Sequence, residues 1–341
     1  MRGKRFTWHH VVFIAIALII HCGGASQGGG NQKPANGVQA ETKPREPQQN
    51  SSSAKPNTTG RQPGAKPSEK VFLWKIESLI SSDKTIYLLG SVHMGNASFY
   101  PLDPVIEEAY RKSEVLAVEV NTVAVPLAKA MEVVFSHAKL PPGEKIYTSL
   151  SAEVWNKLIL ALEKYQVPVE KVLNLKPWFA AITLSILRVV EQGYSTDFGI
   201  DKYFVKKGDK PIIELESINY QLGLFDGMSA ELQELLLLDA IEGSLQSGGD
   251  LEEAVKAWRE GDAQAMNYAM FKDLNEHPEF RPIYKLLIID RNYGMAEGIE
   301  AALINHDALF VVVGAGHIVG DEGLAAIFEK KGYKVRQLEK R

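Results

Sequence analysis

Two stretches of this sequence share one pattern, an aliphatic run that ends in Gly-x-x-His, and the pattern places an imidazole where it could do chemistry. The first motif runs from Gly90 to His93, and the second runs from Gly314 to His317. Glycine lets the backbone turn sharply where a strand ends. The imidazole then emerges at the carboxyl edge of a sheet, which is where open α/β sheets bind ligands.

The relative direction of the two strands decides whether the histidines can share a site. If the strands are parallel, His93 and His317 lie at the same edge of the sheet and can converge. If they are antiparallel, five residues at about 3.3 Å each separate the two rings by roughly 17 Å, and a shared site is impossible.

Carboxylates stand at matching places on two further expected strands. Glu119 lies within 115–120, on the strand face that Val115 and Ala117 otherwise keep apolar, and Glu216 follows the strand 211–215. A charge buried in this way needs a partner. Two histidines and one or two glutamates at neighbouring strand ends form a ligand set suited to Zn, Mn or Fe. The alternative is structural: each Glu pairs with a Lys or Arg, and each His caps a turn.

The elements that must position these residues can be read from hydrophobic periodicity. Strands are expected at Val71–Ile76, Thr85–Val92, Val115–Val120, Pro211–Leu215, Leu309–Val313 and Tyr333–Leu338. Helices are expected at Pro101–Lys112, Ala124–Ala138, Ala152–Tyr165, Trp178–Gln192 and Ala230–Leu245. The order predicts an α/β fold with a mixed, largely parallel sheet built from the N- and C-terminal portions of residues 71–341, and with a helical lobe inserted at about 124–304.

The N-terminal part predicts export. A basic start precedes a ten-residue apolar run from Val11 to Ile20, which is too short to span a bilayer but fits the core of a secretory signal. The lone cysteine, Cys22, follows directly, as in bacterial lipoproteins, where this residue is lipidated; the alternative is an ordinary signal peptide with an inert thiol. Residues 1–22 are therefore expected to be a signal peptide. Residues 23–70 are expected to be a disordered tether because they contain hardly any aliphatic residues.

The charge distribution excludes some classes of function. The first 70 residues carry ten Lys and Arg against three Asp and Glu, whereas the rest of the chain carries 28 against 39. An acidic body argues against nucleic-acid binding, which depends on clustered basic side chains. A single cysteine excludes an internal disulfide and a cysteine-rich zinc module.

Taken together, the motifs resemble the TraB/GumN family, whose animal relatives are the TIKI metalloproteases. The resemblance covers nearly all of residues 71–341. It rests on these segments: Trp74-Lys-Ile, Tyr87-Leu-Leu-Gly-Ser-Val-His93, Tyr100-Pro-Leu102, Ala117-Val-Glu119, Leu215-Glu216 with Gln221, Arg291-Asn292 with Met295, and Val313-Gly-Ala-Gly-His317 with Gly320, Gly323 and Gly332-Tyr333.

The resemblance implies a metal-dependent hydrolase. His93 and His317 would bind a divalent metal (Mn, Co, Zn or Fe), Glu216 would complete the metal ligands, and Glu119 would act as general base, although the two carboxylates could exchange roles. Arg291 would anchor a substrate carboxylate through its planar fork; otherwise it pairs with Glu297 or another acidic group.

The expected substrate is a peptide or protein. The expected location is the cell envelope, with a lipid anchor in a membrane, namely the periplasmic side of the outer membrane if the cell is Gram-negative. The alternative is a non-catalytic envelope lipoprotein that uses the same pocket to bind haem or a peptide, because the wider fold group also holds haem-binding members and fold does not dictate chemistry.

Overall fold

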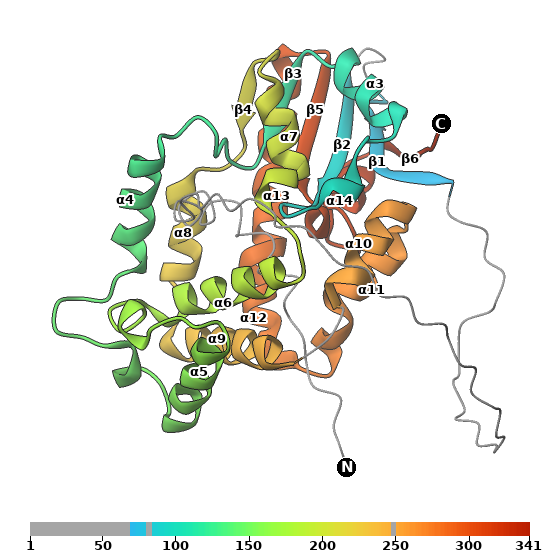
Figure 1. Cartoon of the computed structure of the whole chain (residues 1–341). Helices are drawn as coiled ribbons and strands as arrows, with labels where there is room; N and C mark the ends of the chain where they lie inside the picture. Colours follow the sequence, from blue (N-terminus) through green and yellow to red (C-terminus); the bar gives the residue numbers. More distant parts are fainter. Residues whose placement is uncertain (1–68, 80–83, 247–249) are drawn as a thin grey trace, which may run out of the picture. The chain divides into compact units, whose positions relative to one another are not determined.

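The computed structural model describes residues 69–79, 84–246 and 250–341. The predicted signal peptide, Cys22 and residues 23–68 of the predicted tether lie outside these residues, whereas Lys70, expected to be in the tether, begins the first strand. Six strands form one sheet: β1 (Lys70–Glu77), β2 (Thr85–Ser91), β3 (Val115–Val118), β4 (Ile212–Glu214), β5 (Ala308–Gly314) and β6 (Lys334–Glu339). Their order across the sheet is β4-β3-β5-β2-β1-β6 (Figure 1). β4, β3, β5 and β2 pair in parallel, whereas β1 is antiparallel to both of its neighbours.

The helices carry most of the remaining described residues. They are α3 (Pro104–Lys112), α4 (Leu127–Ala138), α5 (Ala152–Lys164), α6 (Pro177–Glu191), α7 (Ile200–Lys207), α8 (Ile218–Asp226), α9 (Ala230–Leu245), α10 (Asp250–Glu260), α11 (Ala263–Phe271), α12 (Arg281–Tyr284), α13 (Asp290–Asn305) and α14 (Leu324–Lys330). None of the helices in the described residues is long and apolar enough to cross a membrane.

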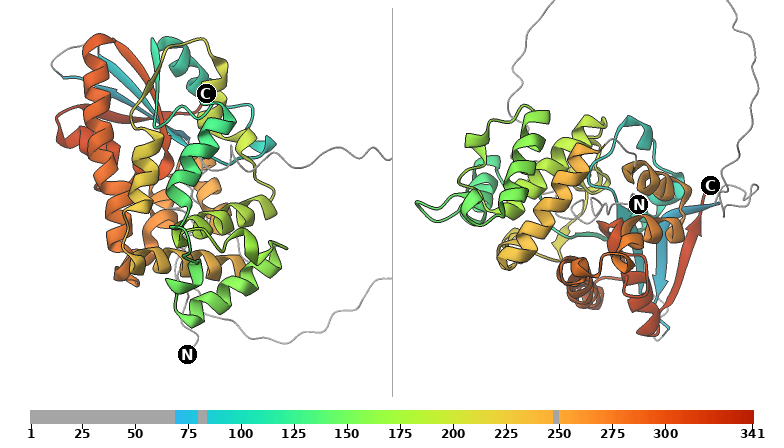
Figure 2. Two further views of the ribbon diagram at one scale, coloured as in Figure 1. Left: turned by 90° about the vertical axis from the view of Figure 1, so that its left-hand side faces the viewer. Right: turned by 90° about the horizontal axis from the view of Figure 1, so that it is seen from below.

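Helices cover both faces of the sheet (Figure 2). On one face, α3 and α7 pack on β5 through Tyr110, Phe204 and Phe310, whose ring centroids lie 4.8 to 5.3 Å apart. On the other face, α13 contacts β5 and α14. The central strand β5 is buried from Leu309 to Gly314, as expected of a parallel strand covered on both sides.

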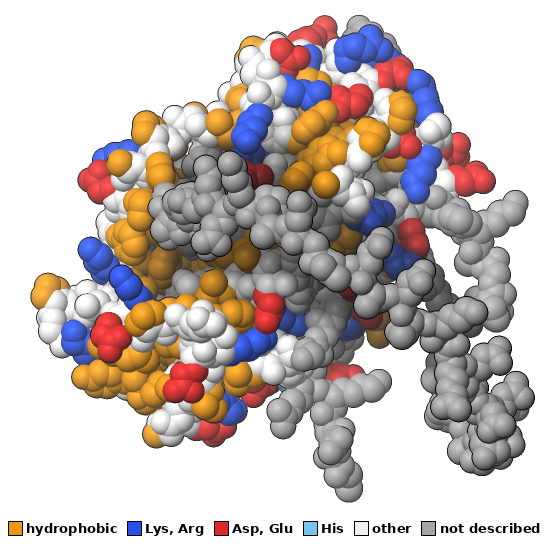
Figure 3. Space-filling view, viewed as in Figure 1, with side chains coloured by type: hydrophobic (Ala, Val, Ile, Leu, Met, Phe, Trp, Pro, Cys, Tyr) orange, Lys and Arg blue, Asp and Glu red, His pale blue; other side chains and the backbone are white. Residues whose placement is uncertain are grey.

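A helical lobe extends from the sheet edge (Figure 1). In it, α6 and α5 pack against α9, and α4 packs against α8. Trp178 of α6 is fully buried and stacks on Phe225 of α8, with ring centroids 5.5 Å apart. On the face shown in Figure 3, Lys and Arg side chains lie scattered among Asp, Glu and apolar side chains.

The expected fold class is confirmed, and the differences lie at element ends. β3 stops at Val118, so Glu119 follows the strand instead of lying inside it. α4 begins at Leu127 and not at Ala124, because Pro126 occupies the position before the helix and disfavours helical backbone in the residue that precedes it. α3 begins at Pro104, where the Asp103 side chain accepts a hydrogen bond from Val105 N.

Candidate active site

The strand register brings the two Gly-x-x-His motifs together. β2 and β5 are parallel neighbours, with Gly90 opposite Val313 and Ser91 opposite Gly314. His93 and His317 therefore follow the carboxyl ends of adjacent strands. The register shows that the two strands are parallel. This is the arrangement that allows the two rings to share a site.

The same edge of the sheet carries both carboxylates. β3 pairs with β5 and with β4, both in parallel, so Val118 lies between Val312 and Glu214. Glu119 comes directly after β3, and the Glu216 N–H donates to the Glu119 carbonyl at 2.9 Å. The four residues that the sequence singled out thus follow the carboxyl ends of four adjacent parallel strands.

The guanidinium of Arg291 joins the two carboxylates. Its Nη2 donates to Glu119 Oε2 at 2.5 Å and to Glu216 Oε2 at 2.7 Å, and its Nε donates to Glu216 Oε1 at 3.0 Å. Gln221 Nε2 also donates to both carboxylates. The Arg291 side chain is 2% exposed. Arg291 therefore pairs with Glu119 and Glu216, and not with Glu297, which the sequence offered as a partner.

Charge pairing stabilises the ionised state of this cluster. Burial opposes ionisation of Glu119, but Arg291, the two histidines and the Gly314 N–H outweigh it and hold the pKa of Glu119 at about 2. Burial likewise opposes the charge on Arg291, and Glu119 and Glu216 raise its pKa above the ordinary value. Glu119 and Arg291 are therefore both charged at neutral pH.

Arg291 lies just after an irregular helical turn. Residues Lys285–Ile289, between α12 and α13, form a π-helix, an irregularity that is often found at functional sites. Arg291 Nη1 donates to the carbonyl of Leu287 inside this segment at 3.1 Å. This hydrogen bond helps to hold the guanidinium in place.

His317 is fully buried and oriented by Asn292. His317 Nδ1 lies 2.6 Å from Asn292 Oδ1, while Asn292 Nδ2 donates to the carbonyl of Glu322 at 2.7 Å. Because the Asn292 oxygen can only accept, Nδ1 of His317 carries the hydrogen and Nε2 keeps its lone pair. Burial and the nearby Arg291 lower the pKa of His317 to about 3, so the ring is neutral.

His93 is oriented by Asp201, in the first turn of α7. Its Nδ1 lies 3.2 Å from Asp201 Oδ2, an ion-pair contact. Asp201 is itself held by Ser91, whose hydroxyl donates to Asp201 Oδ1 at 3.0 Å and accepts from Asp201 N at 3.1 Å. Burial lowers the pKa of His93, but Asp201 and Glu119 outweigh burial, and the net shift is upward.

The start of α7 is attached to the end of β2, and this attachment explains the contact between Asp201 and His93. The N–H of Ile200 donates to the carbonyl of Val92 at 3.1 Å. Gly199, at the N-cap, allows the close approach, since a Cβ there would lie 2.4 Å from the carbonyl oxygen of His93. Asp201, in the first turn of α7, is thereby placed beside the imidazole.

The reactive atoms converge beside Gly314. A Cβ built on Gly314 would lie 3.4 Å from Glu119 Oε1, 3.4 Å from His93 Nε2 and 3.5 Å from the ring of His317. The Gly314 N–H also donates to Glu119 Oε1 at 2.7 Å. The absence of a side chain at this residue leaves a small space that three functional groups border.

The glycines of the two motifs have different functions. At Gly90 a Cβ would lie 2.4 Å from the ring of Phe72, so this glycine permits close packing. Its carbonyl accepts from Trp258 Nε1 at 2.7 Å. Gly314, in contrast, borders the site, and the two similar motifs are therefore not equivalent.

The donor atoms suit a divalent metal. Nε2 of His93 and Nε2 of His317 are buried and have no hydrogen-bond partner among the described residues, and two imidazole nitrogens with one carboxylate oxygen are common ligands of Zn, Mn and Fe. Within the described part of the chain, no three His, Cys, Asp or Glu side chains form a cluster arranged to hold an ion. The metal stays a prediction.

The other histidines among the described residues lie outside this site. His137, His277 and His306 are partly exposed and lie 3.1 to 3.5 Å from Asp226, Glu279 and Glu114 respectively. The sequence assigned them surface or structural positions. It did not single out Asp201, and it used Asn292 and Gln221 only as part of a resemblance, because the first turn of a helix and a helix interior carry no motif that marks a histidine partner.

The chain is thus an α/β protein with two histidines and a Glu-Arg-Glu cluster buried at the carboxyl edge of its parallel strands. Residues 72–337 match the TraB/PrgY/gumN family, and since they make up most of the chain, the protein belongs to that family.

Two relatives are both named YbaP, from Escherichia coli strain K12 and from Shigella flexneri. Each is 23% identical over 260 residues, covering 74% of this chain and 91% of the relative. No solved structure matches the chain.

Proposed function

We propose that this protein is a metal-dependent hydrolase that cleaves an amide bond of a peptide or protein. The observation that carries the proposal is the convergence beside Gly314 of Glu119 Oε1 with two imidazoles whose Nε2 atoms are free of hydrogen bonds among the described residues. Structural histidines normally satisfy both ring nitrogens when they are buried. Here both Nε2 atoms lack a hydrogen bond among the described residues, and His93 Nδ1 has only its ion-pair contact with Asp201. Two buried rings with free nitrogens at one place are arranged to bind something.

In this proposal His93 and His317 hold a divalent ion (Mn, Co, Zn or Fe) through Nε2. A bound ion of this kind polarises a carbonyl and lowers the pKa of water towards about 7. Asp201 and Asn292 hold the two rings by Nδ1, as the outer partners of metal-binding histidines usually do. The charged state of Glu119 is maintained by Arg291.

The two glutamates take different roles. Glu119 Oε1 faces the space beside Gly314, so we assign Glu119 to metal or to the attacking water. The carboxylate oxygens of Glu216 are taken up by Arg291 and Gln221, so we assign Glu216 to positioning Arg291. The sequence predicted Glu216 as a metal ligand and Glu119 as the general base, with the two roles exchangeable. The present assignment differs, because it gives Glu216 neither of these roles.

The experiment that tests the function is metal analysis of the purified protein, followed by cleavage of a peptide library. We expect a bound divalent ion and cleavage that stops in a chelator and returns when the ion is restored. Glu119→Gln should lose cleavage, whereas Glu279→Gln, a matched change in an exposed helical turn, should keep it. Bound haem, or peptide binding without cleavage, would instead support the non-catalytic alternative.

Gly314→Ala is expected to remove metal binding without unfolding the protein. The backbone of Gly314, at φ −51° and ψ 137°, suits any L-residue, so the free energy of unfolding should change by less than about 1 kcal/mol. The new methyl group would fill the space between Glu119 Oε1 and His93 Nε2. Metal content and thermal unfolding check this.

The control for Gly314→Ala is Gly294→Ala, because a Cβ at Gly294 meets nothing within 4 Å. It should keep full metal content and gain about 0.5–1 kcal/mol from helix propensity. Normal metal content in Gly314→Ala would contradict the assignment of the site to this space.

We also propose that the protein is exported and anchored in the cell envelope through lipid on Cys22. Replacing Cys22 with Ala in the full-length chain should move the protein from the membrane fraction to the soluble fraction, because the acyl chains supply the membrane affinity. Immunoblots of fractionated cells measure this. Detergent-dependent fractionation of Cys22→Ala would contradict a lipid anchor at this residue.

A further inference from the structure

A cavity of about 30 Å³ lies between the carboxyl edge of the sheet and the helices α10 and α11. A volume of this size admits a water molecule or a small group. We name it the apolar chamber. It is lined by Ser91, Val92, His93, Leu251, Ala254, Val255, Met266, Met270, Gly314, Ala315 and Gly316.

The chamber is apolar on almost every side. Its walls are aliphatic and thioether side chains of α10 and α11, and its floor is the small-residue segment Gly314-Ala-Gly316. Among the lining residues, His93 is the only one with a titratable side chain. A charged or polar group placed there would lose its hydration with little compensation, whereas an aliphatic group would not.

The chamber and the candidate active site share two residues. His93 and Gly314 line the chamber, and the Cβ position of Gly314 is 3.4 Å from both His93 Nε2 and Glu119 Oε1. A group bound in the chamber is therefore held directly beside the atoms that would do the chemistry. Such adjacency is how an enzyme orients a substrate bond.

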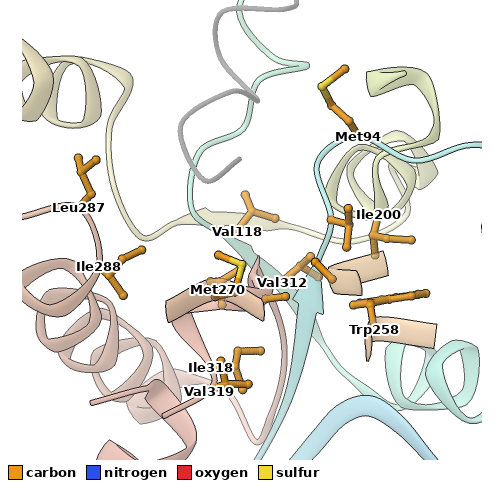
Figure 4. Packing of buried hydrophobic residues seen from close by; sticks show 14 of the residues in the cluster. Met94, Val118, Ile200, Trp258, Met270, Leu287, Ile288, Val312, Ile318 and Val319 are labelled. Atoms are coloured by element: carbon orange, nitrogen blue, oxygen red, sulfur yellow. The ribbon is translucent and has the colours of Figure 1, made fainter. Parts of the chain in front are cut away.

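We propose that the apolar chamber binds one small aliphatic side chain of the substrate, next to the bond that is cleaved. The assignment of a cleaved bond rests on the proposed function, but the binding of an aliphatic group does not. Ala254 and the glycines at the floor leave room for the group, and the volume of about 30 Å³ limits its size. Figure 4 shows Met270 among the buried apolar side chains at this end of the sheet, and methionine side chains adjust readily to the shape of a bound group.

The test measures the binding of N-acetyl-valinamide by NMR, with protein labelled with ¹³C at the methionine methyl groups. The signals of Met266 and Met270 should shift, while those of Met131 in α4 and of Met228, between α8 and α9, should stay. The α-amide of N-acetyl-aspartate, whose side chain is a charged carboxylate, should bind at least tenfold more weakly. Equal binding of the two amides, or shifts that exclude Met266 and Met270, would overturn the proposal.

Two variants make the test specific to the chamber. Ala254→Leu fills it and should weaken N-acetyl-valinamide binding at least tenfold. Met270→Ala enlarges it and should shift the preference from N-acetyl-valinamide towards N-acetyl-phenylalaninamide, which provides a second readout if Ala254→Leu fails to fold. Unchanged affinity in folded Ala254→Leu, or an unchanged preference in Met270→Ala, would overturn the proposal.

Failure of the chamber and failure of the hydrolase are distinguishable. The binding experiment is carried out in a chelating buffer, so it depends on neither metal nor turnover. Aliphatic binding without any cleavage would refute the hydrolase and leave the chamber in place. Cleavage that treats Val and Asp peptides alike would refute the chamber and leave the hydrolase in place.

Discussion

Replacing Arg291 with methionine is expected to lower the free energy of unfolding by about 3–5 kcal/mol, because removing one partner of a buried ion pair leaves uncompensated charge. Arg291 donates to both Glu119 and Glu216 and is 2% exposed. Without it, two carboxylates lie side by side with only Gln221 as a shared donor. Urea unfolding measured in a chelating buffer gives the change.

The loss caused by Arg291→Met should depend on pH with a definite sign. The pKa of Glu119 is about 2 in the folded protein, below the value of about 4.3 expected in the unfolded chain. A lowered pKa adds stability above about pH 4.3 that disappears as the pH falls towards 2. In the variant this contribution is missing, so the difference from the wild type should shrink on acidification.

Arg259→Met is the matched control for Arg291→Met. Arg259 is exposed on α10, where its guanidinium lies 5.0 Å from the ring centroid of Phe99. Its replacement should cost less than about 1 kcal/mol, with little dependence on pH between 4 and 7. An equally small loss in Arg291→Met would show that the buried cluster contributes nothing to folding.

His93→Ala and His317→Ala should each remove most metal binding, and the double variant should be little worse than either single one. Residues that hold one ion act as a unit, so their effects are not additive. We expect any hydrolytic rate to fall by more than about 100-fold, since changes to the outer partners of metal ligands alone cost 10–100-fold. Calorimetric titration with Zn²⁺ and Mn²⁺ measures the affinity.

His306→Ala is the control for the paired histidines. His306 lies at the end of α13 with Glu114 as its neighbour, 3.5 Å away, and its loss should leave metal binding unchanged. Independent and additive losses in His93→Ala and His317→Ala would argue for separate roles. Unchanged affinity in both would refute ligation by histidine and require another occupant for the space beside Gly314.

The amino-acid sequence was sufficient to predict the class of fold and the identity of the four residues that follow the strand ends. Aliphatic runs of strand length and the helical periods between them predict an α/β sheet, because such patterns reflect local backbone geometry. The Gly-x-x-His motifs and the two glutamates could be found because each follows an apolar run. A strand is recognised by its own residues, and its carboxyl end marks the ligand-binding edge in this type of sheet.

The way these residues contact one another follows from the packing of distant segments. The parallel direction of β2 and β5, the pairing of Arg291 with both glutamates, and the support of His93 by Asp201 depend on contacts between residues about 75 to 220 positions apart. The apolar chamber depends likewise on α10 and α11 folding over the sheet edge. Such contacts arise from the packing of the whole chain, so no local pattern reveals them, whereas the strands and their ends follow from periodicity within each segment.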